Sequence, residues 1–317
     1  MRILITGCAG FIGVNFTNYW LAKHATDEII GVDCLTYAAN QNALSELKKD
    51  NRFVFYQTDV CERKQIFNIF EKERPDIVVH FAAESHVDRS IVSPDIFMRT
   101  NVIGTQVVLD ASLHFNVKRF HQISTDEVYG DLPIDSKESF TENSPLKPSS
   151  PYSASKAAAD LLVLACYRTH GLPITISRSS NNYGKYQHVE KFIPTIIKKA
   201  IAGMRIPVYG DGKNVRDWLF VEDHCTAIEK ILQTGKVGEV YNIGGDNEKS
   251  NLELVFEILR LLKKDNNRIE FIEDRKGHDR KYSLNSYKIR SELGWKATTP
   301  FKCGLLKTID CYLSENV

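Results

Sequence analysis

The chain has 317 residues, 43% of them hydrophobic, and can therefore bury a large core. Its 41 lysines and arginines nearly balance 40 aspartates and glutamates, so its net charge does not suggest binding to nucleic acid or to an anionic membrane. The nine histidines show no ligand spacing, and we expect no metal site. Seven cysteines without a C-x-x-C pair favour reduced thiols and a cytoplasmic location. No apolar run reaches the ~18 residues that span a membrane, and the first strand begins too early for a secretion signal.

Residues 2–33 are predicted to form a strand, a glycine loop, an amphipathic helix and a second strand. Gly7, Gly10 and Gly13 allow a tight turn, close approach of backbone N–H groups to a pyrophosphate, and close helix packing. Asp33 follows Gly13 by 20 residues and ends the second strand, where its carboxylate can bind ribose hydroxyls and would repel a 2′-phosphate. The unit predicts NAD in preference to NADP, although three glycines alone would also suit a plain tight turn.

Two later segments extend this candidate cofactor site. Asp59 closes a predicted third strand and can hydrogen-bond an adenine edge, and residues 81–85 offer small side chains past which a nicotinamide arm can lie. Either position also suits a strand end capped by a short side chain.

The stretch 117–130 is predicted to be a buried strand that ends in polar residues. Thr125, Asp126 and Glu127 would then lie at the carboxyl end of a strand, where open α/β sheets bind their ligands. An acidic pair after a strand is also typical of a solvated turn. The glycine loop favours the catalytic interpretation.

A helix is predicted over residues 151–170, with Ser150 as its N-cap and Gly171 as its stop. Tyr152 and Lys156 lie four residues apart and hence on one face of this helix. The chain contains two other Tyr-x-x-x-Lys pairs, at 19–23 and 209–213, but neither follows a strand that ends in Ser or Thr. We therefore predict that Thr125, Tyr152 and Lys156 form a hydride-transfer triad beside the acidic pair.

Alternating strand and helix patterns over residues 1–180 predict an α/β fold, a doubly wound parallel (Rossmann) sheet that binds NAD. The rhythm breaks after residue 180, so residues 181–317 are expected to be mostly a smaller C-terminal substrate-binding lobe, with some segments returning to the first domain. The polar stretch 131–150 is predicted to be a loop, either a lid or a static connector. A single long helix is expected over residues 93–115.

The chain resembles the extended short-chain dehydrogenase/reductases (the NAD-dependent epimerase/dehydratase family) and, among them, the dTDP-glucose 4,6-dehydratases. The segments that carry the resemblance span nearly the whole length and are GCAGFIG, VDCLTYAAN, HFAAESHVDRS, ISTDEVYG, YSASK, RSSNNYGKYQHVEKFIP, VYGDGKNVRDWLFVEDH, YNIGGDNEKSN and DRKGHDRKY. The chain departs from the family pattern at Cys8, Cys34, Ala39 and Lys276, none of which is a group expected to do chemistry.

The resemblance implies a lyase of deoxysugar biosynthesis that carries out a three-step cycle on a nucleotide-linked glucose. Tyr152, assisted by Lys156 and Thr125, takes the proton of the sugar 4-hydroxyl while hydride leaves C4 for NAD. Glu127 then removes the C5 proton while Asp126 protonates the departing C6 hydroxyl. The hydride returns to C6, which gives a 4-keto-6-deoxy sugar without net redox change.

The resemblance also implies which residues bind the two ligands. The candidate cofactor-binding residues are Gly7, Gly10, Phe11, Ile12, Gly13, Asp33, Cys34, Thr36, Asp59, Val60, Phe81, Ala82, Ala83, Thr100, Tyr152, Lys156 and Asn182. The candidate substrate-binding residues are Ser85, Thr125, Asn181, Lys191, Phe192, Pro207, Val208, Tyr209, Arg216, Asn251, Arg275, His278, Asp279 and Tyr282. Arg216 is the preferred diphosphate clamp, with a surface ion pair to Asp217 as the alternative. Asn251 also resembles a plain helix N-cap.

In the same family, long helices like those over 93–115 and 151–170 pair into a four-helix dimer interface, so a homodimer is expected, with intramolecular packing as the alternative. Three other functions stay open from the sequence. The same reaction on UDP-glucose differs by one methyl group of the base. A 4-epimerase would share Thr125, Tyr152 and Lys156 without needing Asp126 and Glu127. An NAD-binding redox regulator would need none of these catalytic groups.

Overall fold

The computed structural model describes residues 1–314, and its centre is a seven-stranded sheet in which every neighbouring pair is parallel. The order across the sheet is β10-β6-β5-β4-β1-β2-β3. The strands are β1 (Arg2–Thr6), β2 (Glu28–Asp33), β3 (Phe53–Gln57), β4 (Ile77–His80), β5 (Arg119–Thr125), β6 (Ile174–Ser179) and β10 (Val240–Ile243). Strand order reverses between β1 and β4, which confirms the predicted doubly wound fold.

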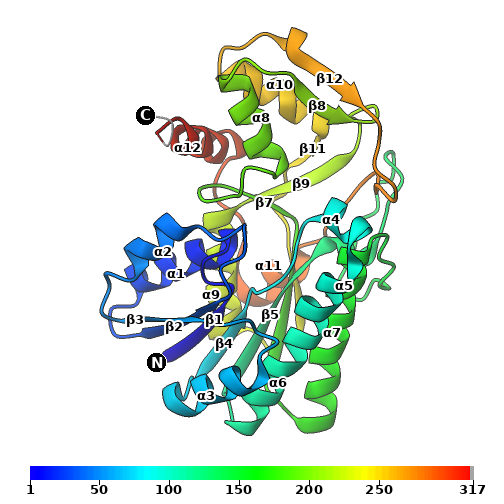
Figure 1. Cartoon of the computed structure of the whole chain (residues 1–317). Coiled ribbons are helices and arrows are strands. Elements are labelled where there is room, and N and C mark those ends of the chain that lie inside the picture. The colour runs from blue at the N-terminus through cyan, green and yellow to red at the C-terminus, as the bar shows by residue number, and fades with distance from the viewer. Residues whose placement is uncertain (315–317) are drawn as a thin grey trace.

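Helices cover both faces of this sheet, and each face has its own apolar core (Figure 1). On one face lie α1 (Phe11–Lys23), α2 (Gln41–Leu47) and α9 (Val221–Thr234). On the other face lie α3 (Arg63–Glu73), α6 (Thr105–His114) and α7 (Pro151–His170). Both β10 and α9 come from beyond residue 180, so part of the C-terminal sequence completes the Rossmann sheet.

The remaining C-terminal sequence forms a second lobe above the sheet in Figure 1, with a core around Trp218 and Phe220. A three-stranded sheet has the order β11-β9-β7, and β12 pairs with β8 in parallel. The strands are β7 (Asn181–Tyr183), β8 (Ile206–Tyr209), β9 (Val215–Phe220), β11 (Glu248–Ser250) and β12 (Ile269–Ile272). The helices of this half are α8 (Phe192–Ile201), α10 (Asn251–Leu261) and α12 (Phe301–Ser314), with α11 (Tyr287–Leu293) packed on β10.

The predicted bounds of α7 are confirmed in detail. Ser150 caps its N-terminus, because the Ser150 hydroxyl accepts from the Ser153 amide and the Ser153 hydroxyl accepts from the Ser150 amide. Gly171 ends the helix in the left-handed conformation at φ +73°. Tyr152 and Lys156 therefore lie in the first two turns, next to the carboxyl ends of β5 and β6.

The expected single helix over residues 93–115 is wrong in its middle. After α4 (Val87–Val92), the chain forms α5 (Pro94–Phe97), a π-helical segment (Met98–Gly104) and α6. The buried Asn101 amide in this segment bonds both the backbone N–H and the C=O of Glu84, and also the Ser155 hydroxyl. These polar contacts occur at the wider turn, and π-turns inside α-helices are often found at functional sites.

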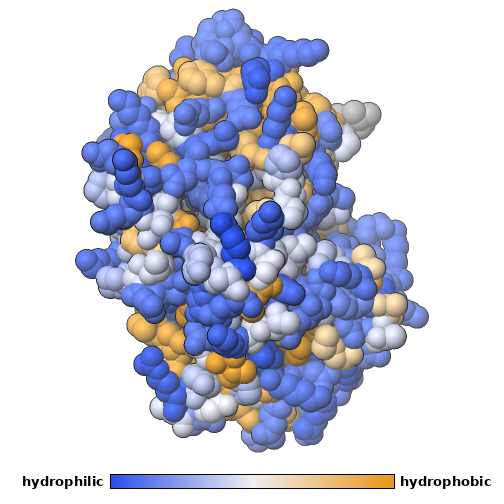
Figure 2. Space-filling model, turned by 180° about the vertical axis from the view of Figure 1, so that it is seen from behind, coloured by the Kyte–Doolittle hydropathy of each residue, from blue (hydrophilic) through white to orange (hydrophobic). Residues whose placement is uncertain are grey.

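A second correction concerns Asn251, which resembled an N-cap. The N-cap of α10 is Ser250, which forms a capping box with Glu253, and Asn251 is the first residue inside the helix. In the described part of the chain no helix combines the length and apolar character that a bilayer span requires. The face drawn in Figure 2 is mainly hydrophilic, with smaller hydrophobic areas over both lobes.

Candidate active site

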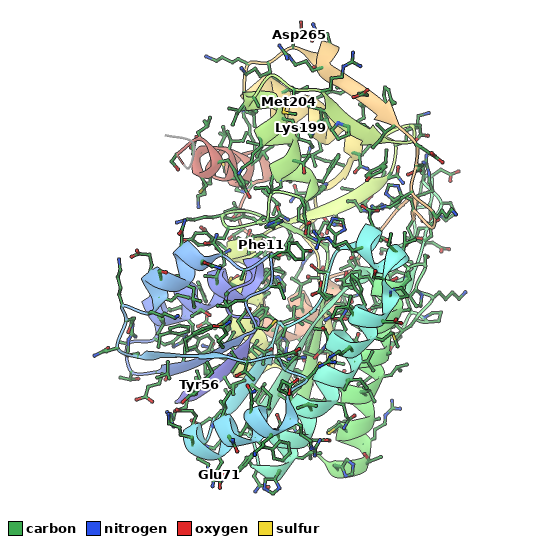
Figure 3. The ribbon with its side chains drawn as sticks, in the orientation of Figure 1. Phe11, Tyr56, Glu71, Lys199, Met204 and Asp265 are labelled. Atoms are coloured by element: carbon green, nitrogen blue, oxygen red, sulfur yellow. The ribbon has the colours of Figure 1, made fainter. Side chains whose placement is uncertain are left out.

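A cavity of about 370 Å³ lies along the carboxyl ends of the central strands, where it receives residues from the loops that follow β1, β2, β3, β4, β5 and β6. Phe11 at the start of α1 lines this cavity, and Figure 3 places Phe11 at the junction of the two lobes. An open parallel sheet binds its ligands at this position.

The glycine loop between β1 and α1 has the geometry of a pyrophosphate cradle. Gly7 adopts φ +68°, and a Cβ there would lie 2.7 Å from the backbone N of Ala82. A Cβ on Gly13 would lie 2.1 Å from the Gly7 carbonyl oxygen, so both positions exclude any side chain. Gly10 caps α1 without a side-chain hydrogen bond, so the first N–H groups of the helix remain available for an anion.

Asp33 stands at the end of β2 as predicted. One carboxylate oxygen accepts from the Ala9 amide at 2.9 Å and the other from the Leu35 amide at 2.8 Å. Burial raises the pKa of this carboxyl, and these amide hydrogen bonds oppose that rise. The carboxylate keeps lone pairs for ribose hydroxyls, and its charge disfavours a 2′-phosphate. The residues present therefore fit NAD.

Every residue of the predicted cofactor set lines the same cavity, from Gly7 in the glycine loop to Asn182 on β7. Cys8, which departs from the family pattern, is fully buried in the core under α1, and its sulfur lies 2.8 Å from where a Cβ on Gly31 would be. Cys8 therefore faces the sheet and does not narrow the loop.

The polar residues after β5 occupy the floor of the cavity. Thr125 caps the 3₁₀ turn Asp126–Tyr129 by accepting from the Glu127 amide at 3.3 Å, and its hydroxyl donates to Asp126 Oδ1 at 3.2 Å. Asp126 is only 2% exposed, and its other carboxyl oxygen has no hydrogen-bond partner. The alternative of a solvated turn is therefore wrong. An orphaned buried oxygen at a cavity wall is typical of a group that acts on a ligand.

The two acids differ in their electrostatic surroundings. Burial raises the pKa of Asp126 well above its ordinary value, and the charge of Glu127 raises it further. Burial also raises the pKa of Glu127, but the positive charges of Arg275, Arg216 and Lys191 oppose that rise. Arg216 also opposes the rise at Asp126, so the two pKa values differ chiefly through the charges of Glu127 on Asp126 and of Arg275 and Lys191 on Glu127. Two carboxyls in unequal surroundings can take the separate roles of acid and base. The surroundings thus favour Asp126 as proton donor and Glu127 as proton acceptor.

Tyr152 and Lys156 face the same floor from α7, and both are nearly fully buried. The Lys156 ammonium donates to the Ile123 carbonyl at 2.6 Å. Burial raises the pKa of Tyr152, the Glu127 charge adds to this, and the contact with the Thr125 hydroxyl lowers it. Deprotonating this phenol requires positive charge nearby, which Lys156 and the oxidised nicotinamide ring can supply.

One of the other Tyr-x-x-x-Lys pairs also forms a contact, but in a different place. Lys23 donates to the Tyr19 hydroxyl at 2.9 Å, and both bond Glu229 on α9. This cluster ties α1 to α9, and none of its members lines the cavity. Spacing alone therefore does not identify a catalytic pair.

Burial lowers the pKa of Lys156 from 10.5 to about 8. Between these pH values the unfolded chain holds a proton that the folded chain has largely lost, so the free energy of unfolding rises with pH there. The penalty is fully present below about pH 8 and amounts to about 3 kcal/mol. We expect Lys156→Met to stabilise the NAD-free protein by up to about 3 kcal/mol at pH 7 and to flatten this rise, as measured by urea unfolding at several pH values.

The matched control for this stability test is Lys23→Met, which removes an exposed lysine of the same motif and should leave the pH dependence between 8 and 10 intact. A Lys156→Met protein that is less stable than the unaltered protein at pH 7, and whose free energy of unfolding rises with pH as steeply, would contradict the inference that burial lowers the pKa of Lys156.

A second, smaller cavity of about 50 Å³ continues from the first, because Glu127 and Asn181 line both. Arg216, Arg275, His278, Asp279 and Tyr282 line it, as the predicted substrate set requires. Ser85, Thr125 and Lys191 line the first cavity. The structure does not bring Phe192, Pro207, Val208, Tyr209 or Asn251 to either cavity, and Val208 is fully buried. Tyr209 lies beside the second cavity, its ring centroid 6.1 Å from that of His278.

The alternative of a surface ion pair between Arg216 and Asp217 is wrong. Arg216 is 6% exposed and donates to the Asp279 carbonyl at 2.8 Å, with its guanidinium 4.2 Å from the Tyr282 ring centroid. Asp217 is 3% exposed and accepts from the amides of Gly245 and Asn247, each at 2.7 Å. Successive β-strand residues point to opposite sides, so the two side chains separate.

Sequence reasoning missed several lining residues, notably Glu84, Ser124, Ser180, Gln187, His188 and Glu190. Glu84 lies within the segment 81–85 whose other residues were predicted, and the last three precede Lys191, so proximity in sequence to predicted residues was the signal that could have found them.

Comparisons with known proteins point to one family over nearly the whole chain. A family model described as GDP-mannose 4,6 dehydratase matches residues 4–308. A dTDP-glucose 4,6-dehydratase of Haemophilus influenzae is 50% identical, over 99% of this chain and 98% of that protein. One from Salmonella typhimurium is 46% identical, over 99% and 93%.

Two solved structures show both the likeness and its limits. DesIV, a dTDP-glucose 4,6-dehydratase of Streptomyces venezuelae crystallised with NAD and TYD bound, superposes with a TM-score of 0.96 at 44% identity, over 100% of this chain and 98% of that one. A UDP-glucose 4-epimerase of Thermotoga maritima, crystallised with UDP-glucose, reaches a TM-score of 0.92 at 28% identity over 100% of both chains. The fold is thus shared with epimerases, while sequence identity is higher to the dehydratases.

Proposed function

The chain belongs to the GDP-mannose 4,6-dehydratase family, among its dTDP-glucose 4,6-dehydratases, and on that premise we propose that it converts dTDP-glucose to dTDP-4-keto-6-deoxyglucose. The observation that carries the proposal is the acid-base pair Asp126 and Glu127 beside Thr125, Tyr152 and Lys156 on the floor of one cavity. A 4-epimerase needs no such pair, and a regulator needs neither set.

NAD, held by the glycine loop and Asp33, supplies the redox chemistry, since it takes a hydride from C4 and gives it back at C6. The protein supplies the proton transfers. Tyr152 accepts the proton of the 4-hydroxyl, with Lys156 favouring the phenolate and Thr125 hydrogen-bonding the same oxygen. Because the Lys156 ammonium donates to the Ile123 carbonyl, its charge is held at a fixed place beside β5.

Elimination is the task of the acidic pair. The 4-ketone acidifies the C5 proton, Glu127 removes it, and the C5–H electron pair forms the C5–C6 double bond as the C6 hydroxyl leaves with the Asp126 proton, as water. Burial and the charge of Glu127 raise the pKa of Asp126, which favours its protonated form as the donor. Glu127 gains the C5 proton in this step and can return it to C5 after hydride arrives at C6. The proton that Tyr152 took from the 4-hydroxyl balances the one that Asp126 gave to the leaving water, and exchange with solvent restores both groups.

The residues that line the second cavity are proposed to bind the diphosphate. Arg216 and Arg275 both line this cavity, and their guanidinium groups can bind phosphate oxygens through paired N–H donors. Glu127 at the junction of the two cavities then faces the sugar. We assign Asn181 and Lys191 to the same ligand, with Pro207 to Tyr209 flanking the base from outside the cavity. On this proposal residues 1–180 mainly bind NAD and the lobe from 181 onward mainly binds the sugar nucleotide.

A homodimer in the cytoplasm completes the proposal. Exposed apolar side chains lie on α4, on the π-helical segment Met98–Gly104 and on α7, which contacts both. They include Val92 (83% exposed), Ile103 (55%) and Leu161 (57%). Such side chains on neighbouring helices suit a helix-to-helix interface with a second copy, which light scattering at micromolar concentration would detect. None of the seven cysteines forms a disulfide within residues 1–314, as in proteins of reducing compartments.

The test of function is incubation of the purified protein, without added NAD, with dTDP-glucose, UDP-glucose and CDP-glucose in separate reactions. We expect a 4-keto product, seen as a chromophore in alkali, to form fastest from dTDP-glucose. Hydrogen isotope placed at C4 should appear at C6 of the product. A product that keeps its primary alcohol, or one inverted at C4, would overturn the proposal in favour of an epimerase.

A further inference from the structure

The segment 184–191, between β7 and α8, crosses from the second lobe to the Rossmann domain. Figure 1 shows the green chain that leads to α8 passing near the blue N-terminal helices. Hydrogen bonds to three parts of the first domain fix this crossing. Asn15 donates to the Lys185 carbonyl at 2.9 Å, Tyr37 donates to Glu190 at 2.9 Å, and Lys191 donates to the Ser85 carbonyl at 2.8 Å. The segment is therefore attached to three separate parts of the first domain.

Glu190 is the most heavily engaged residue of this crossing. One carboxylate oxygen accepts from the Tyr37 hydroxyl and lies 3.6 Å from His188, and the other lies 3.4 Å from Arg89 and 3.5 Å from His86. The Arg89 guanidinium also lies 3.6 Å from the centroid of the Tyr37 ring. The Glu190 side chain is only 17% exposed. The proposed reaction uses none of Tyr37, Arg89 and Glu190.

The contact joins two walls of the large cavity. Thr36 and Ala38, on either side of Tyr37, line the cavity, and so do His188 and Glu190. The segment that carries Tyr37 begins directly after Asp33, the residue that fits the adenosine ribose. Separation of Tyr37 from Glu190 would therefore free the segment that follows Asp33 from the second lobe.

We propose that Tyr37, Arg89 and Glu190 form a clasp that retains NAD in the cavity between turnovers. The proposal rests on the NAD binding in the proposed function, because a cofactor that is oxidised again in every cycle gains from staying bound. The three residues touch each other across the cavity wall, so they act on the rate of NAD release and not on proton transfer. Glu190 and Tyr37 are thus positioning residues for the cofactor.

The experiment measures release of NAD from the purified holoprotein in the absence of any sugar nucleotide. Released NAD is converted by an excess of an NAD-consuming enzyme, and its appearance is followed in time. We expect Tyr37→Phe, which keeps the ring beneath Arg89 and removes only the donor, to release NAD about three to ten times faster. Glu190→Gln should have a similar effect, because the amide loses the ion pairs. The matched control is Tyr287→Phe, which removes a hydroxyl from a tyrosine that is 71% exposed and outside both cavities.

The double variant tests whether the two residues act through one contact. Tyr37→Phe combined with Glu190→Ala, which removes the hydrogen bond and the ion pairs of Glu190 together, should release NAD no more than about twice as fast as Glu190→Ala alone, since the hydrogen bond that Tyr37→Phe removes is then already lost. Equal release rates for the unaltered protein and both single variants would overturn the clasp while leaving NAD binding intact. An unaltered protein that retains no NAD would overturn the clasp together with the cofactor assignment.

Discussion

Glu127→Gln is expected to stop the reaction after the first step. The amide has nearly the same shape as the acid, but it cannot take the C5 proton, so turnover should fall by about 10²- to 10⁴-fold. Because Tyr152, Lys156 and Thr125 are untouched, oxidation at C4 should continue. Mixing the holoprotein with dTDP-glucose should therefore produce the near-ultraviolet absorbance of reduced nicotinamide without formation of the 4-keto-6-deoxy product.

The matched control is Glu138→Gln, an exposed glutamate in the connector 131–150 that lines neither cavity. It should dehydrate dTDP-glucose at the unaltered rate. Full dehydration by the Glu127→Gln protein would remove Glu127 from the scheme. Loss of both the absorbance and the product would indicate that Glu127 is needed earlier, for binding or for oxidation.

Tyr152→Phe is expected to abolish the reaction one step earlier. The phenylalanine ring keeps the packing against Phe97, whose centroid lies 6.4 Å away, so folding should survive. The group that accepts the 4-hydroxyl proton is lost. Loss of a general base typically slows a reaction by up to about 10⁴-fold, and we expect turnover to fall by about 10³-fold or more. In contrast to Glu127→Gln, this variant should show no reduced nicotinamide when it is mixed with substrate.

Tyr19→Phe provides the comparison for Tyr152→Phe within the same sequence motif. Tyr19 and Lys23 have the same spacing and a real hydrogen bond, but they lie between α1 and α9. Activity should be unchanged in this protein. A Tyr152→Phe enzyme that retains more than a tenth of the unaltered turnover would show that another group accepts the proton.

Much of the catalytic half is readable from the sequence because its signals are local. The glycine loop, the strand that ends in Thr125 and the helix between Ser150 and Gly171 each depend on residues within a few positions of one another. Helix capping is a local contact, so the Ser150 cap was predictable. The π-helical turn at Asn101 was not, because its cause is a set of hydrogen bonds to Glu84 and Ser155, which are distant in sequence.

The acidic pair shows the same division. Its position after β5 followed from the sequence, but the different surroundings of Asp126 and Glu127 depend on burial and on charges from Lys191, Arg216 and Arg275, far along the chain. The contacts of the Arg216 side chain also depend on tertiary structure. Its neighbour Asp217 suggested an ion pair, and the alternation of the strand turned the two side chains apart.

The sequence by itself predicted the Rossmann sheet, the preference for NAD and a set of candidate catalytic groups, since the residue types and short spacings of each motif leave few other uses. Only the tertiary structure decided how the surroundings of Asp126 and Glu127 differ, which lobe residues reach the second cavity, and that Tyr37, Arg89 and Glu190 meet. The physical reason is that desolvation and Coulomb interactions depend on distance in space, and residues separated by many positions approach each other only after the chain has packed.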